Sequence, residues 1–346
     1  ALLLKRADFS ILAALAADEE SSQLHLTEIA QPVLFAVQVG ITRLLRSYGL
    51  KADRALGHSV GEVAAAWAMG VLTLEQAVLV IHERSLAQSC TKGTGRMAAV
   101  GMAVDGVEAV IKRLGLDTGI EIAAYNSPKS CTLSGSYEAL LRLGKEMEAQ
   151  AIFFRILDLD DAFHSSHMNP IRGRLMSALS GLKPAAGKGG FISTVTGDYL
   201  DGKILTAEYW WQNIRQPVHF EQAVMTAIDD GRHVFLEIGP HPILRSYLNE
   251  ILRSNEVEGQ AVATMTRDAS RRSPVRAALS PCHLLRCSME DATLFPEPGR
   301  YARLPNYPWQ KETHWYPKTT EAYDLFARNK LHPLLGYPLK EKEGRW

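Results

Sequence analysis

The stretch ALGHSVGEVAAAWAMG, residues 55–70, places a serine between two glycines, after a short apolar run and before an alanine-rich segment. Gly-x-Ser-x-Gly at a strand-to-helix turn is typical of a nucleophile elbow, because the strained turn needs very small flanking side chains. The N–H of Val60 and the start of the helix would then face a developing oxyanion. The pattern predicts that Ser59 is a nucleophile; the alternative is a small residue in a tight loop.

A serine nucleophile needs a base within hydrogen-bond reach. His58 is adjacent, but neighbouring side chains diverge on a sharp turn, so we interpret it as a packed histidine beneath the turn. The downstream candidate is His164 in DLDDAFHSSHMNP, which lies after a strand ending in acids. His164 and His167 could form a metal pair, but no third ligand occurs at recognisable spacing, so we predict no metal. We interpret His167 as part of a solvated helix face and give Asp160 and Asp161 no role.

Arg84 lies in a predicted helix, TLEQAVLVIHERSLAQ, with Thr73 as its N-cap. It follows Ala77 and Val80 at helical steps and so lies at the edge of an apolar stripe. A surface position is the default for a helical arginine, whereas an unpaired buried charge is costly and requires a partner. A carboxylate ligand bound by the planar guanidinium would be such a partner. Both interpretations stay open at this point.

The composition narrows the function classes. The chain has 346 residues, enough for roughly two domains, and equal totals of 38 basic and 38 acidic residues. This balance gives no indication of binding to nucleic acid or to an anionic membrane. The four cysteines lack CxxC spacing and fit reduced thiols in a cytoplasmic protein. The longest apolar run, VAAAWAMGVL, is too short to span a bilayer, so we expect no membrane association.

The order of predicted elements indicates an α/β fold. DRALGH reads as a short buried strand before the helix of GEVAAAWAMGVL. Residues 96–160 show a β-α-β-β-α-β order, which is the ferredoxin-like arrangement. From about residue 270, proline and arginine increase and periodicity fades, so SPVRAALSPCH and ARLPNYPWQKETHWYP are predicted to form an extended strap.

Seven motifs occur in a fixed order: GHSVGE, Arg84, GRMAAVGM, AAYNSP, AFHSSHM, NIRQPVHF and FLEIGPHPIL. Together they resemble the malonyl-CoA:acyl-carrier-protein acyltransferase domain of a modular polyketide synthase, over nearly the whole chain. The resemblance implies a hydrolase-like core with a parallel sheet, residues 1–95 and 161–268, into which the ferredoxin-like subdomain is inserted. Residues 269–330 resemble the linker after such a domain, and residues 331–346 resemble the start of a dehydratase domain.

The resemblance also implies a mechanism. Ser59 would carry the acyl group as an ester, His164 would be its general base and acid, and Arg84 would pair with the malonyl carboxylate. The donor would be malonyl-CoA and the acceptor the phosphopantetheine thiol of an acyl carrier protein, with no bound cofactor. Ketosynthase and dehydratase domains of the same synthase would be neighbours. A main-chain carbonyl near residues 230–231 would orient the histidine.

Weaker implications concern the choice of extender unit. Val60 after the serine and Phe163 before the histidine accompany malonyl in this family, whereas glutamine and YASH accompany methylmalonyl at these places. A phenylalanine fills the space that an α-methyl group needs, but one methylene changes discrimination by only about 1–3 kcal/mol. Asp161 departs from the usual residue at the head of this stretch. Asn126 matches a family position near the pocket.

The resemblance further implies an opening strand and a GQGSQ-like loop, whose first glutamine supplies an oxyanion contact. Residues 1–30 match the family segment located after that loop, so we expect the chain as given to be poorly soluble and nearly inactive. Two other functions stay open. An esterase or thioesterase of the α/β-hydrolase class would need an acid between the serine and the histidine. A non-catalytic fragment would only dock neighbouring domains.

Overall fold

The computed structural model describes residues 2–266, 274–287, 289, 303 and 305. All of its helices and strands belong to one compact unit, residues 1–296. The predicted start of a dehydratase domain, residues 331–346, and most of the predicted linker, residues 269–330, lie outside the described residues.

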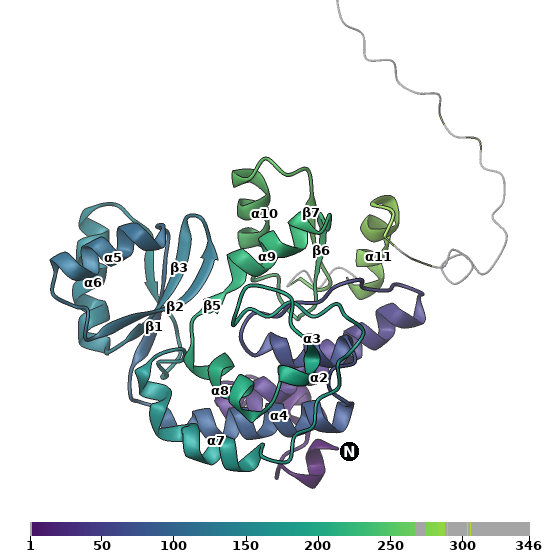
Figure 1. Cartoon of the computed structure of the whole chain (residues 1–346), viewed down its shortest axis with the longest axis horizontal. Coiled ribbons are helices and arrows are strands. Elements are labelled where there is room, and N and C mark those ends of the chain that lie inside the picture. The colour runs from purple at the N-terminus through teal and green to yellow at the C-terminus, as the bar shows by residue number, and fades with distance from the viewer. Residues whose placement is uncertain (1, 267–273, 288, 290–302, 304, 306–346) are drawn as a thin grey trace, which may run out of the picture. The chain divides into compact units, whose positions relative to one another are not determined.

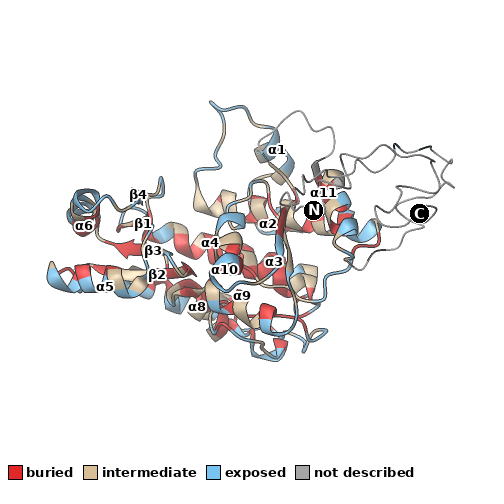
Figure 2. Ribbon diagram, turned by 90° about the horizontal axis from the view of Figure 1, so that it is seen from above, coloured by how far each residue is buried: buried red, intermediate tan, exposed pale blue. Residues whose placement is uncertain are grey.

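The small sheet is formed by the segment predicted to be ferredoxin-like (Figure 1). Its elements have the predicted β-α-β-β-α-β order: β1 (Arg96–Val100), α5 (Val104–Arg113), β2 (Ile120–Ser127), β3 (Ser130–Gly135), α6 (Tyr137–Ala149) and β4 (Phe154–Ile156). The strand order is β4-β1-β3-β2-β5, and the first four strands are paired antiparallel. The amphipathic helices α5 and α6 bury their apolar faces with the strands and leave their outer faces exposed (Figure 2).

One strand of the small sheet comes from a distant part of the chain. The two-residue strand β5 (Val218–His219) pairs parallel with β2, with Val218 opposite Ala124. The predicted subdomain is therefore joined through its sheet to the segment that comes after the NIRQP sequence.

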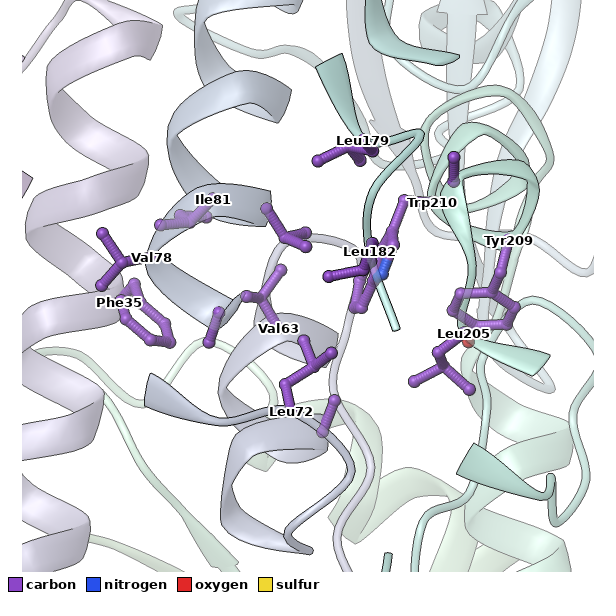
Figure 3. Packing of buried hydrophobic residues seen from close by; sticks show 14 of the residues in the cluster. Phe35, Val63, Leu72, Val78, Ile81, Leu179, Leu182, Leu205, Tyr209 and Trp210 are labelled. Carbon is purple, nitrogen blue, oxygen red and sulfur yellow. The ribbon is translucent and has the colours of Figure 1, made fainter. Parts of the chain in front are cut away.

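The largest apolar cluster lies among helices on either side of the Ser59 turn. Figure 3 shows Phe35, Val63, Ile81 and Trp210 converging from four helices. These helices are α2 (Thr27–Ser47), α3 (Gly61–Ala68), α4 (Leu74–Gln88) and α8 (Ala207–Arg215). Thr73 is the N-cap of α4 as predicted, because its hydroxyl accepts the Gln76 N–H at 3.2 Å.

Helix α2 is long and apolar enough, by length and composition alone, to cross a membrane. In the structure it packs against α3 and α4, and side chains such as Val33 and Val39 are buried in the protein interior. One part of this helix is therefore buried inside the protein.

Parallel pairing outside the small sheet is short among the described residues. It comprises β6 (Val234–Glu237) with β7 (Gln260–Ala263), and a single bridge between Ala55 and Phe191. The strand predicted at DRALGH is thus reduced to this bridge, in which Ala55 N–H donates to Gly190 O at 2.8 Å. These pairs alone do not establish the predicted hydrolase-like sheet. The remaining helices are α1 (Ile11–Ala16), α7 (Arg172–Ala178), α9 (Phe220–Asp229) and α10 (Arg245–Ser254), with short 3-10 turns at Leu3–Lys5, Ser89–Thr91, Ser166–Ile171 and Gly202–Ile204.

The prediction of an extended strap is wrong for SPVRAALSPCH, where residues 274–284 form helix α11 (Pro274–Leu284). Val275, Ala278, Leu279 and Cys282 recur at helical spacing and are buried, and the helix packs against α2. Burial of this apolar stripe outweighs the disruptive effect of the proline content.

Candidate active site

The turn at Ser59 has the strained geometry predicted for an elbow. Ser59 has φ 51°, a left-handed conformation that non-glycine residues rarely adopt. Helix α3 begins two residues later, at Gly61. A Cβ on Gly57 would lie 2.2 Å from the carbonyl carbon of Gly61, whereas a Cβ on Gly61 would have its nearest neighbour at 3.9 Å. The first glycine of the motif is therefore required sterically and the second is not.

The structure brings Ser59 and His164 together. Ser59 Oγ lies 2.7 Å from His164 Nε2, and His164 Nδ1 lies 2.8 Å from the main-chain oxygen of Gln216. Because a carbonyl only accepts, Nδ1 carries the proton and Nε2 is free to accept the proton of the Ser59 hydroxyl. His164 is itself held at φ 58°.

The carbonyl that orients His164 was predicted near residues 230–231, and that prediction is wrong. Helix α8 ends at Arg215, and Gln216 is extended with ψ 157°, so its carbonyl leaves the helical direction and points at the imidazole. Pro217 comes next, and a proline disfavours the helical conformation of the residue before it. That local pattern in NIRQPVHF was available in the sequence. Asp230 instead pairs with Arg54 at 2.9 Å, away from the histidine.

Burial controls the charge of His164. The side chain is buried, and loss of solvation, followed by the positive charge of Arg84, lowers the pKa of His164 to about 3. The bond to Gln216 acts in the opposite direction. The imidazole is therefore neutral at neutral pH, which is the state a general base requires.

Arg84 is buried, with 1% of its surface exposed, so the surface interpretation is wrong. Its Nη2 donates to Ser59 Oγ at 2.9 Å and its Nε to Asn213 Oδ1 at 3.1 Å. Its Nη1 donates to the amide oxygens of Gln31 at 2.6 Å and Gln88 at 2.8 Å. All of these direct partners are neutral, and burial lowers the pKa of Arg84 to about 9. A buried cation with neutral partners beside a hydroxyl is suited to an incoming carboxylate.

Sequence reasoning missed Glu62, which is fully buried beneath the elbow. Its carboxylate accepts hydrogen bonds from Tyr209 at 2.8 Å, Asn213 Nδ2 at 2.7 Å and the Thr194 hydroxyl at 2.9 Å, and also from the Thr194 N–H. Burial raises the pKa of Glu62 to about 7, against the effect of these bonds. A glutamate directly before the apolar run VAAAWA was the signal in the sequence.

The chain matches the family described as acyl transferase domain over residues 2–287. The protein belongs to this family. It is 33% identical to polyketide synthase GfsA of Streptomyces halstedii over 313 residues, which is 90% of this chain and 4% of GfsA. The acyltransferase domain from module 8 of the salinomycin polyketide synthase is 32% identical, with a TM-score of 0.80 over 84% of this chain and 69% of that chain.

A loading acyltransferase from the avermectin modular polyketide synthase is 31% identical, with a TM-score of 0.77 over 82% of this chain and 88% of that chain. The acyl transferase domain described here therefore shares the α/β fold of polyketide synthase acyltransferases. It spans only 4% of the length of GfsA, one of the curated relatives that it matches.

The remaining predicted residues of this acyl transferase domain surround the elbow. Val60 and Phe163 are partly buried and pack against the main apolar cluster. The N–H of Val60 makes no hydrogen bond with the described residues, and it directly follows Ser59. Asn126 does not bond to Ser59; its Oδ1 lies 2.9 Å from His58 Nε2. Asn126 therefore reaches the nucleophile only through His58.

His58 is a packed histidine, as predicted. Its ring lies 5.5 Å from that of Phe220, and burial lowers the pKa of His58. His167 lies in the 3-10 turn, where Ser165 Oγ is 3.2 Å from its Nδ1. Among the described residues, no group of three or more His, Cys, Asp or Glu side chains is arranged to bind a metal ion.

Asp160 and Asp161, which were given no role from the sequence, contact residues that are distant in the sequence. Asp161 is buried and accepts a hydrogen bond from Thr27 at 3.2 Å, and burial raises the pKa of Asp161. Asp160 forms an ion pair with Arg96 at the start of β1. Neither acid contacts His164 in the structure, where the orienting group is Gln216.

Proposed function

We propose that this domain transfers a malonyl unit from malonyl-CoA, through an ester on Ser59, to the phosphopantetheine thiol of an acyl carrier protein in a polyketide synthase. One observation carries the proposal: Ser59 Oγ lies 2.7 Å from the neutral base His164 and 2.9 Å from the buried cation Arg84. A proton acceptor and a carboxylate-binding group thus meet at one hydroxyl. The similarity to polyketide synthase acyltransferase domains supports the same reaction class.

In the acylation step, His164 Nε2 takes the Ser59 proton while Oγ attacks the thioester carbonyl. The Val60 N–H is available to donate to the oxyanion that forms. When the intermediate collapses, the carbon–sulfur bond breaks, and the imidazolium returns the proton to the sulfur of CoA. Gln216 holds the imidazole in the required tautomer through the 2.8 Å bond to Nδ1.

The transfer step reverses these roles. The thiol of the carrier-protein phosphopantetheine gives its proton to His164, and the sulfur attacks the ester carbonyl on Ser59. The carbon–oxygen bond to Ser59 breaks, and the imidazolium returns the proton to Oγ. The enzyme ends in its starting state, with no bound cofactor involved.

Arg84 explains a preference for an acyl group with a free carboxylate. Its positive charge contributes to the lowered pKa of His164. A malonyl carboxylate paired with the guanidinium neutralises that charge, so the imidazolium that forms during reaction is less disfavoured. An acetyl group cannot do this. Val60 and Phe163 are proposed to favour malonyl over methylmalonyl by filling the space of an α-methyl group.

The surroundings of His164 favour a transferase over an esterase of the α/β-hydrolase class. Such an esterase orients its histidine with an acidic side chain, whereas His164 Nδ1 is bonded to the main-chain oxygen of Gln216. We further propose that the small sheet is an inserted ferredoxin-like subdomain in a hydrolase-like core. Ketosynthase and dehydratase domains of the same synthase are the proposed neighbours.

Intact-protein mass spectrometry after mixing with malonyl-, methylmalonyl- or acetyl-CoA tests the proposal. We expect the malonyl adduct to form fastest and to map to Ser59. Ser59→Ala should give no adduct, while the control Ser166→Ala, which removes an exposed hydroxyl, should load like the parent. An adduct that persists at another residue in Ser59→Ala would contradict the assignment.

Replacing the guanidinium tests the carboxylate contact. Arg84→Ala should lower the ratio of malonyl to acetyl loading by roughly 10²–10⁴-fold, the equivalent of about 3–5 kcal/mol for one partner of a buried charge pair. Arg142→Ala, which removes an exposed arginine on α6, is the matched control and should leave the ratio unchanged. An unchanged ratio in Arg84→Ala would show that the carboxylate is bound elsewhere.

A further inference from the structure

The amide of Asn213 lies between the carboxyl group of Glu62 and the guanidinium of Arg84, both of which are all but inaccessible to solvent. Its Oδ1 accepts the Nε–H of Arg84 at 3.1 Å, and its Nδ2 donates to Glu62 Oε2 at 2.7 Å and to the Ser59 carbonyl at 3.2 Å. Exposure is 0% for Glu62, 1% for Arg84 and 2% for Asn213. Glu62 and Arg84 are therefore connected through one amide, without direct contact.

The two neighbours fix which way this amide points. The two oxygens of Glu62 accept hydrogen bonds from four donors, and a guanidinium can only donate. The oxygen of Asn213 must face Arg84, and its NH₂ group must face Glu62. The opposite orientation would place two donors against each other at Arg84 and leave the buried carboxylate without a partner.

Glu62 is held so that it presents an acceptor to Asn213. The Thr194 N–H and hydroxyl donate to Oε1, and Tyr209 donates to Oε2, the oxygen that also accepts from Asn213. Tyr209 and Asn213 lie one turn apart on α8, and Figure 3 shows Tyr209 within the main cluster. The carboxylate thus has donors on both oxygens and cannot rotate without losing them.

We propose that Glu62 and Asn213 are positioning residues that set the plane of the Arg84 guanidinium and thereby its selectivity for a carboxylate-bearing acyl group. This inference rests on the proposed function. Neither residue touches the acyl group; both act by fixing Nε of Arg84, so that Nη2 is directed at Ser59, 2.9 Å away. Specificity is then determined partly by an acid that lies behind the arginine.

The proposal can be tested by exchanging the hydrogen-bond donor and acceptor groups of residues 62 and 213. Glu62→Gln introduces an NH₂ group opposite the NH₂ of Asn213, so the amide must turn and direct a donor at Arg84. Adding Asn213→Asp restores an acceptor toward Arg84 and lets the new glutamine donate to the new carboxylate. The double variant also keeps the total charge of the parent. Its rescue is expected to be partial, because the bond to the Ser59 carbonyl is lost.

The experiment measures malonyl and acetyl loading of Ser59 by mass spectrometry in the 346-residue parent, Glu62→Gln, Asn213→Asp and the double variant. We expect Glu62→Gln to lower the malonyl-to-acetyl ratio by about 10-fold, the scale of a misdirected buried hydrogen bond to a charge, and the double variant to exceed both single variants. Leu143→Ala is the control: it opens a cavity in the small sheet, away from Glu62 and Asn213, so it should lower the unfolding midpoint but not the ratio.

The outcomes separate the two proposals. Because slow loading of the parent is expected from the sequence, only a complete absence of an acyl group on Ser59 after prolonged incubation would contradict the proposed function. Loading of the parent, however slow, with an unchanged ratio in Glu62→Gln, or a double variant no better than either single variant, would overturn the positioning role alone. An equal fall in Leu143→Ala would also overturn it. If Glu62→Gln does not fold, Asn213→Ala takes its place, and its ratio must fall.

Discussion

The interior of the small sheet and the interior beneath the elbow are stabilised in different ways. Under the small sheet, side chains such as Leu133, Leu140 and Leu143 are completely buried in an apolar cluster. Beneath the elbow, Glu62 and Arg84 are buried just as deeply but are linked by directed hydrogen bonds. Apolar burial tolerates small shifts, whereas a buried polar group is costly once its partner is misplaced. Precision at the site therefore depends on polar partners.

Backbone strain can also be compared between the active site and the small sheet. Both Ser59 and His164 adopt a positive φ, at 51° and 58°. In residues 96–156 the non-glycine residue with positive φ is Ala151, which lies in the loop between α6 and β4. Ala151, Glu256 and Arg286 have positive φ just after the ends of helices α6, α10 and α11, a common place for this conformation. Ser59 and His164 have it at the two residues proposed to react, where the surrounding structure must hold an unfavourable conformation.

The largest expected effect comes from closing the space inside the elbow. Gly57→Ala would place a Cβ 2.2 Å from the Gly61 carbonyl carbon and 2.3 Å from Glu62 N. Backbone cannot yield as a flexible side chain does, so the turn must open and displace Ser59. We expect loading to fall by about 10²-fold or more, since a shift of about 1 Å has that cost. Malonyl labelling measures it.

The second glycine of the motif is the control for the first. A Cβ on Gly61 would have Gln38 Nε2 as its nearest neighbour, at 3.9 Å, and the position opens helix α3. Gly61→Ala should therefore keep both loading and stability close to the parent. Equal damage from the two substitutions would show that the motif needs glycine for reasons other than space.

An intermediate effect is expected from a cavity in the small sheet. Leu143→Ala removes a fully buried side chain and should lower the free energy of unfolding by roughly 2–5 kcal/mol. The malonyl-to-acetyl ratio should not change, because the apolar cluster does not contact Arg84. Denaturant unfolding and loading of the same sample measure both. Leu141→Ala, on the same helix but 40% exposed, should affect neither; a change in the ratio in Leu143→Ala would break the comparison.

The smallest expected effect is a pH dependence. The pKa of His164 is about 3 in the folded protein, against 6.5 for an unperturbed histidine. Between these values only the unfolded chain binds the proton, so stability falls as the pH falls. His164→Ala lacks this contribution and should lose about 2 kcal/mol less than the parent between pH 7 and 5. Urea unfolding at both pH values measures the difference.

Glu62 contributes with the opposite sign, because burial raises its folded pKa to about 7 and the folded state then binds the extra proton as the pH falls toward 4.5. Since Glu62 is present in both proteins, the comparison between parent and His164→Ala cancels it. Parallel pH curves would show that His164 is protonated in the folded protein.

Local patterns predicted much of this molecule. The elbow at Ser59, the N-cap at Thr73 and the element order of the small sheet each depend on neighbours in sequence, and each was predicted. The strap at residues 274–284 was misjudged because prolines were weighted above an apolar helical stripe.

The polar groups behind the elbow were out of reach for a different reason. Glu62 and Asn213 meet across 151 residues of sequence, and no local pattern predicts such a contact. The orienting carbonyl, which belongs to Gln216, was predicted at the wrong residue, because every residue has a main-chain oxygen and the residue type does not indicate which one is used. Only the proline after Gln216 marked the end of the helix there.

The strand β2 contacts both the segment that orients the base His164 and the residue next to the nucleophile Ser59. At Ala124 it pairs with Val218, which is one proline away from the Gln216 carbonyl that holds His164. Two residues further along the same strand, Asn126 is bonded to His58, the neighbour of Ser59. A change in the twist of the small sheet, or a shift of the sheet against the helices, would therefore move the segment that orients His164 and the contact beside Ser59 together. The distance between Ser59 Oγ and His164 Nε2, across which the proton moves, thus depends on the position of this one strand.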